Sequence, residues 1–96
     1  MAFIAVTYTY ADAPERLDET RPEHRAYLGR LHEAGTVVVS GPLPASSDHR
    51  AGALLILRAD DADDALRTLQ DDPFQVAGLI EACTAREWVP VIGSLD

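Results

Sequence analysis

A histidine and an aspartate are the two residues of this chain best suited to acid–base chemistry as a pair. His24 heads a run of apolar and aromatic side chains at helical spacing, Tyr27, Leu28 and Leu31, so it is expected to face the protein interior. An imidazole can take up or release a proton near neutral pH, and a carboxylate at one ring nitrogen would leave the other free to react. Asp72, in front of Pro73, is the candidate carboxylate. We therefore predict that His24 and Asp72 are catalytic.

Four further residues are predicted to bind substrate. Ser40 could bind a substrate oxygen, the backbone N–H groups near Gly41 and the first turn of the helix could favour an anion, and Arg21 or Arg25 could add a positive charge. Tyr8 lies near the same rim of the sheet. Each feature also has an ordinary structural explanation: a semi-buried histidine, an N-capping aspartate, or a serine and glycine that only end a strand.

The elements that must position these residues follow the order βαββαβ. Thr20 and Glu23 form a possible capping box, with Pro22 in the first helical turn and Gly35 as the terminating glycine. Residues 11–19 are expected to be a polar connection, and Asp60 and Asp72 are expected to cap the later helical segments. Strands are predicted over 3–10, 36–40, 52–58 and about 80–90, and helices over about 21–34 and 61–70.

This order predicts an α+β, ferredoxin-like sandwich, with an antiparallel sheet covered on one face by helices. Right-handed connections then bring the end of the first strand, the start of the first helix and the end of the second strand to one rim. The second helix would deliver Asp72 to the same rim. Residues 37–39 and 54–57 are apolar on both faces of their strands, so we expect a homodimer formed through the uncovered sheet face.

Composition limits the classes of function. Ninety-six residues suit a single domain, 1–96, and sixteen acidic residues against eight arginines give a formal charge of −8, which disfavours nucleic acid and anionic membranes. The chain has no apolar run of about 20 residues and no recognisable leader, which favours a cytoplasmic protein. His32 lies about 12 Å along the helix from His24, so the two cannot share a metal, and no metal or cofactor is expected.

Taken together, three segments resemble the YCII-related (YciI-like) family: Arg21–Leu31 with the pattern R-x-x-H-x-x-Y-L-x-x-L, the turn 40–43, and residues 72–74 with 77–79 after them. The ending 86–88 is also similar. The resemblance implies a ferredoxin-like fold in a dimeric α/β-barrel arrangement, an active-site pair at His24 and Asp72, and a turn serine at Ser40. It also implies that activity is unestablished for most members, while one branch eliminates chloride from chlorinated hydroxyhydroquinones.

The leading hypothesis is a cofactor-free enzyme that eliminates or isomerises a small polar or aromatic metabolite, with His24 as base and Asp72 as its orienting partner. Two alternatives remain open. The same pair could hold an anionic metabolite in a non-catalytic binding or accessory module, or it could be a purely structural ion pair that joins the first helix to the Asp72 turn.

Overall fold

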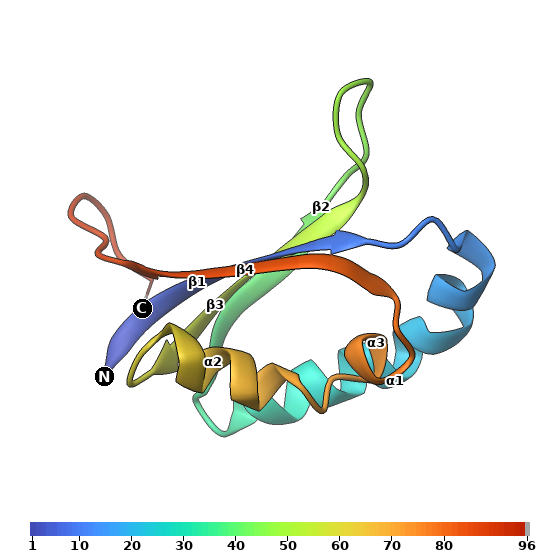
Figure 1. The fold of residues 1–96 in the computed structure, drawn as a ribbon. Helices are drawn as coiled ribbons and strands as arrows, with labels where there is room; N and C mark the ends of the chain where they lie inside the picture. The colour runs from blue at the N-terminus through green and yellow to red at the C-terminus, as the bar shows by residue number, and fades with distance from the viewer. Residues whose placement is uncertain (96) are drawn as a thin grey trace.

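This computed structural model describes residues 1–95, which form four strands and three helices (Figure 1). Their bounds are β1 Ala2–Tyr10, α1 Pro14–Glu33, β2 Val37–Leu43, β3 Gly52–Ala59, α2 Ala62–Leu69, α3 Pro73–Val76 and β4 Ile80–Trp88. The strand order is β2-β3-β1-β4, and every neighbouring pair is antiparallel. The predicted ferredoxin-like βαββαβ sandwich is therefore confirmed, with α3 as a short addition before β4.

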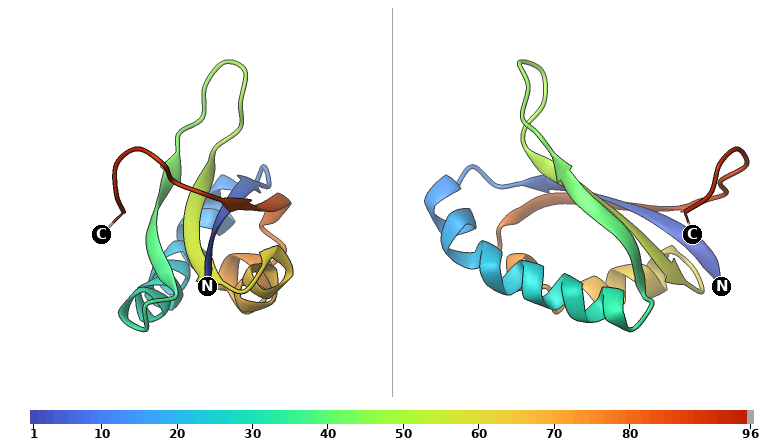
Figure 2. Two further views of the ribbon diagram at one scale, coloured as in Figure 1. Left: turned by 90° about the vertical axis from the view of Figure 1, so that its left-hand side faces the viewer. Right: turned by 180° about the vertical axis from the view of Figure 1, so that it is seen from behind.

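All helices lie on one face of the sheet (Figures 1 and 2). The core lies between the helices and the inward-facing residues of the two central strands, because side chains alternate between the faces of a strand. Residues of β1 and β3 that face inward are essentially inaccessible: Ile4, Val6, Tyr8, Leu55 and Leu57. The other face of the sheet has no helix over it within residues 1–95.

Helix α1 begins earlier than the sequence patterns indicated. Its first residue is Pro14, and Ala13 is an N-cap without a side-chain hydrogen bond, so the predicted capping box of Thr20 and Glu23 is wrong. Residues 14–19 are helical because proline is tolerated at the first position and Leu17 becomes buried against Phe74. Packing therefore overrides the breaking tendency of Pro22, which lies inside the helix.

Helix α1 contains a proline, Pro22, in its interior. A proline has no N–H to donate to the carbonyl four residues earlier, and its ring displaces that carbonyl. The helix changes direction within its N-terminal half, so the first turns rise toward the sheet edge while the remainder runs along the sheet (Figure 2). The beginning of α1 lies beside the end of β1, which it follows after residues 11–13.

Strand β2 continues past its predicted end at Ser40 or Gly41, through Pro42 to Leu43. It is an edge strand, where a residue without a ladder donor is tolerated. Its pairing with β3 shifts by one residue between Val37, opposite Leu57, and Val39, opposite Ile56. Val37 is therefore buried while Val39 faces outward, so this strand carries apolar side chains on both faces, as predicted.

Caps explain how the later helices begin. The side chain of Asp61, not Asp60 as predicted, accepts a hydrogen bond from the N–H of Asp64 and caps α2. Asp72 caps α3 as predicted, by accepting from the N–H of Phe74. Gly35 has a φ of 85°, which agrees with the predicted terminating glycine of α1. The caps fix where α3 starts and therefore where the carboxylate of Asp72 lies.

Candidate active site

His24 and Asp72 are hydrogen-bonded inside the protein. The Nδ1 atom of His24 lies 2.7 Å from Oδ1 of Asp72 and 2.9 Å from Oδ2. The two residues are 6% and 0% exposed. His24 projects from the middle of α1, whereas Asp72 precedes α3, so the contact joins two elements that are far apart in the sequence. The contact expected from topology is thus present.

Two other donors hold the carboxylate of Asp72. The hydroxyl of Tyr8 donates to Oδ2 at 2.9 Å, and the N–H of Phe74 donates to Oδ1 at 3.0 Å. An ionised carboxylate is purely an acceptor, so it matches three surrounding donors when Nδ1 of His24 carries a proton. We therefore assign the Nδ1–H tautomer to neutral His24. Its Nε2 atom then has a free lone pair, as a general base requires.

Phe74 fixes the plane of the histidine ring. The two rings are stacked, with centroids 4.0 Å apart and planes 10° from parallel, and Phe74 is fully buried. Stacking from one side and a hydrogen bond at Nδ1 together restrict both torsions of His24. This role of Phe74 was not predicted from the sequence, because it arises from a contact between α1 and α3.

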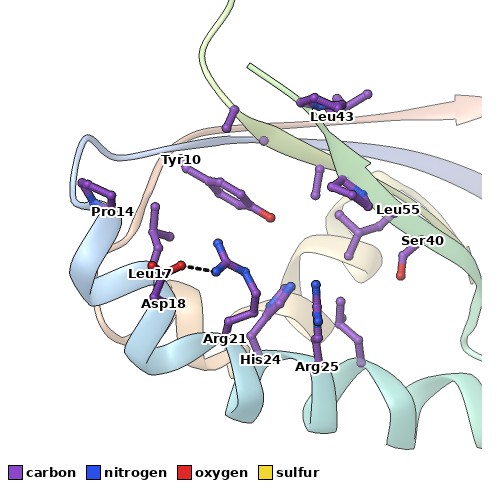
Figure 3. A pocket seen from close by; sticks show the side chains of 17 residues that line it. Tyr10, Pro14, Leu17, Asp18, Arg21, His24, Arg25, Ser40, Leu43 and Leu55 are labelled. Carbon is purple, nitrogen blue, oxygen red and sulfur yellow. Dashed lines mark hydrogen bonds and ion pairs between the residues drawn. The ribbon is translucent and has the colours of Figure 1, made fainter. Parts of the chain in front are cut away.

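A cavity of about 410 Å³ opens next to His24, between the first half of α1 and the ends of β1, β2 and β3 (Figure 3). Ser40, Gly41 and Arg21 line it together with His24, so the structure brings these predicted residues to one place. Ser40 points inward because the register shift in β2 pairs it with buried Leu55. The volume of the cavity suits a small-molecule ligand.

Tyr8 does not line this cavity, contrary to the placement predicted for it. Its side chain is only 1% exposed, and its hydroxyl is used in the hydrogen bond to Asp72. Burial, followed by the charge of Asp72, raises the pKa of Tyr8 well above its ordinary value, so the phenol keeps its proton and remains a donor. Tyr8 therefore lies behind the pair, on the side away from the cavity. Tyr10 lines the cavity instead.

The charges around the cavity also differ from the sequence-based expectation. Because α1 begins at Pro14, His24 is not in its first turn and lies about 15 Å along the helix from that start. The positive end of the helix is thus not adjacent to His24. Positive charge comes from side chains: Arg21, which forms an ion pair with Asp18, and Arg25.

Within residues 1–95, no three histidine, cysteine, aspartate or glutamate side chains gather as they would around a metal ion. The same residues include no helix that combines the length and apolar character needed to cross a membrane.

The fold and this site define a ferredoxin-like α+β domain with a buried histidine–aspartate pair facing a cavity. The chain belongs to the YCII-related domain family, whose sequence model matches residues 1–89. It is 29% identical over 97 residues to Protein YciI of Escherichia coli O6:H1, covering 95% of this chain and 99% of that protein. Protein YciI of Shigella flexneri matches to the same extent.

Two solved structures show the same fold. One is 5-chloro-2-hydroxyhydroquinone dehydrochlorinase from Burkholderia phenoliruptrix, in complex with 2,5-dihydroxybenzoquinone; it has a TM-score of 0.73 and 22% identity, over 91% of this chain and 93% of that one. The other is SnoaB, a cofactor-independent oxygenase from Streptomyces nogalater, with a TM-score of 0.53 and 15% identity, over 93% and 91% of the two chains. At these identities the likeness is one of fold.

Proposed function

We propose that this protein is a small-molecule enzyme in which His24 acts as a general base without a cofactor, in an elimination or an isomerisation. The observation that carries the proposal is the hydrogen bond from Nδ1 of His24 to buried Asp72, in a histidine that also lines the cavity. We infer from it that Nε2 is the ring nitrogen available to a substrate. A base of this kind can remove a proton from a substrate carbon that is acidified by a neighbouring carbonyl or hydroxyl group.

In the proposed reaction, Nε2 takes the proton and the electron pair of the broken C–H bond moves into the substrate. The imidazolium that forms is stabilised by the negative charge of Asp72, which keeps its three hydrogen bonds and takes up no proton itself. In an elimination, the electron pair expels a leaving group such as chloride. In an isomerisation, His24 returns the proton to a different substrate atom.

The structural relatives support this class of reaction without naming the substrate. The relative from Burkholderia is a dehydrochlorinase, and SnoaB is described as cofactor-independent. Both descriptions are compatible with a fold that hosts chemistry built from side chains alone. Ser40, Gly41 and Arg21 are the residues we propose to bind the polar groups of the substrate, since all three line the cavity beside His24.

The direct test is to incubate the protein with 5-chloro-2-hydroxyhydroquinone, and with a set of cyclic enols in deuterium oxide. Chloride release is measured by ion chromatography and hydrogen exchange by NMR. We expect wild type to catalyse one of these reactions, and His24→Gln to lose it by 10²- to 10⁴-fold, which is the usual contribution of a general base. Binding of these compounds without any turnover would instead support the non-catalytic binding module.

We also propose that the protein works as a homodimer joined through the uncovered sheet face. Apolar side chains point away from the helices on this face, which we call the outer face: Phe3, Val39, Leu43, Leu54, Ile56 and Trp88. Several of them are substantially exposed, which is unusual for large apolar side chains clustered on one surface. A second copy of the chain offers a matching surface, and its two-fold axis would close the assembly.

A further inference from the structure

Two arginines and a histidine of α1 lie on one face of the helix. Arg21, His24 and Arg25 are spaced i, i+3 and i+4, and all three line the cavity. Their side chains rise from the helix toward the sheet, and Tyr10 lies above Arg21 (Figure 3). The base proposed above therefore has a guanidinium group on either side of it in the sequence.

The two arginines are in different electrostatic situations. Arg21 forms an ion pair with Asp18, one turn earlier in α1. Arg25 has no hydrogen bond or ion pair with any other residue of the described chain, 1–95. This is notable in a chain with sixteen acidic residues and a formal charge of −8. Arg25 is thus a cation available to a ligand, whereas Asp18 already occupies Arg21.

Tyr10 supplies a hydroxyl on the opposite wall. It is half-buried with its ring edge against Phe74, and it lines the cavity. Burial raises the pKa of Tyr10, while the positive charges of Arg21 and Arg25 act in the opposite direction. Both guanidinium groups are thus close enough to act electrostatically on the phenol. Tyr10 stays protonated at neutral pH and can donate a hydrogen bond.

The remaining wall is largely apolar. Leucine and proline side chains from α1, β2 and β3 form it, including Leu17, Leu28, Pro42 and Leu55. A ligand that fits such a site presents an apolar body to this wall, because a charge buried against these side chains would find no partner. The polar end of the ligand belongs near Arg25 and Tyr10.

We propose that the cavity selects a small ring-bearing anion, a carboxylate or an acidic phenol, whose charged oxygens bind Arg25 and the hydroxyl of Tyr10. A guanidinium group can bind two oxygens at once, which also orients the ligand. This inference deepens the proposed function and rests on it for one step: the anionic end holds the reacting C–H bond beside Nε2 of His24. The guanidinium group of Arg25 would then also stabilise the negative charge that develops on the ligand oxygens during proton removal.

The test measures binding separately from chemistry. Titration calorimetry compares salicylate with salicylamide, which has nearly the same shape but no charge, on wild type, Arg25→Gln and Arg67→Gln. Arg67 is the matched control, since it is an exposed arginine on α2 away from the cavity. We expect wild type to prefer salicylate, and Arg25→Gln to weaken salicylate binding by about 10- to 100-fold, the usual worth of a charged hydrogen bond. Salicylamide binding should change little.

Equal binding of the two compounds, binding of neither at millimolar concentration, or equal effects of Arg25→Gln and Arg67→Gln would overturn the anion proposal. His24→Gln separates the two proposals, because it should abolish hydrogen exchange and keep salicylate binding. Charge-selective binding through Arg25 in a protein without any exchange activity would support the anion site and reject the general base. Hydrogen exchange that depends on His24 but not on Arg25 would support the general base and reject the anion site.

Discussion

Among individual residues, Asp72 connects the site to the core through three hydrogen bonds. Its carboxylate accepts from Tyr8, His24 and the N–H of Phe74, and the residue is completely buried. A carboxylate with that many donors serves several purposes at once: it caps α3, orients His24 and satisfies Tyr8. The structural and catalytic hypotheses for the pair are therefore compatible, since the same contact contributes to both.

The first prediction concerns stability. Asp72→Ala leaves the Tyr8 hydroxyl, the Phe74 N–H and the His24 ring without their acceptor, so the free energy of unfolding should fall by about 3 kcal/mol or more. Urea unfolding followed by circular dichroism measures it. Asp71→Ala is the control, because Asp71 is exposed and should change stability by about 0.5 kcal/mol at most. A similar small change for both variants would mean that the network contributes nothing to folding.

A second prediction concerns the proton on His24. With Asp72 as acceptor, neutral His24 should be the Nδ1–H tautomer, which long-range proton–nitrogen NMR correlations distinguish from the Nε2–H form. In Asp72→Asn the amide can donate or accept, so the preference for Nδ1–H should weaken. An Nε2–H tautomer in wild type would place the proton on the cavity side and remove the proposed base.

A third prediction follows from the raised pKa of Tyr8. The folded-state pKa lies above the unfolded value of about 10, so this group's contribution to stability is fully present below pH 10 and is lost as the pH rises beyond it. Above pH 10, Tyr8 should lower the free energy of unfolding by up to about 1.4 kcal/mol for each unit by which the pH rises. Tyr8→Phe should show a shallower alkaline decline in urea unfolding between pH 9 and 11. An unchanged slope would show that Tyr8 ionises freely.

The elements show how much could be read from the sequence. Strand periodicity and the glycine at position 35 predicted the order βαββαβ, and topology alone brought Asp72 to His24. The helix start was wrong because Pro22 resembles a first-turn proline, and the burial of Leu17 that extends the helix is a tertiary effect. The role of Phe74 also depends on packing between α1 and α3, which no local pattern encodes.

The bend in α1 leads to a fourth prediction. Pro22 prevents a regular hydrogen bond in the middle of the helix, so Pro22→Ala should straighten α1 and move its first turns away from the sheet edge. The packing of Leu17 in the cluster that it forms with Phe74 and Leu79 should weaken, measured as loss of the nuclear Overhauser effects between these side chains. Gly29→Ala is the control, because its added methyl group meets nothing and lies outside the bend. Unchanged effects in Pro22→Ala would assign the bend to the packing of Leu17.

For the whole molecule, the proposed dimer can be tested through the outer face. Leu54→Asp places a charge at the middle of that face without touching the core, so sedimentation velocity should show a monomer where wild type is a dimer. Val76→Asp is the control, since Val76 is exposed on α3, on the helical side. A wild-type monomer at micromolar concentration would refute the dimer.

The register shift between Val37 and Val39 divides β2 into two stretches of opposite parity: odd-numbered Val37 faces inward before the shift, and even-numbered Ser40 after it. A deletion at Val38 would be absorbed there, because regular pairing would still bring Ser40 opposite Leu55. A deletion at Ser40 would leave the later residues of β2 one place short of their partners in β3. A one-residue deletion should therefore be tolerated at Val38 and should disrupt the structure at Ser40.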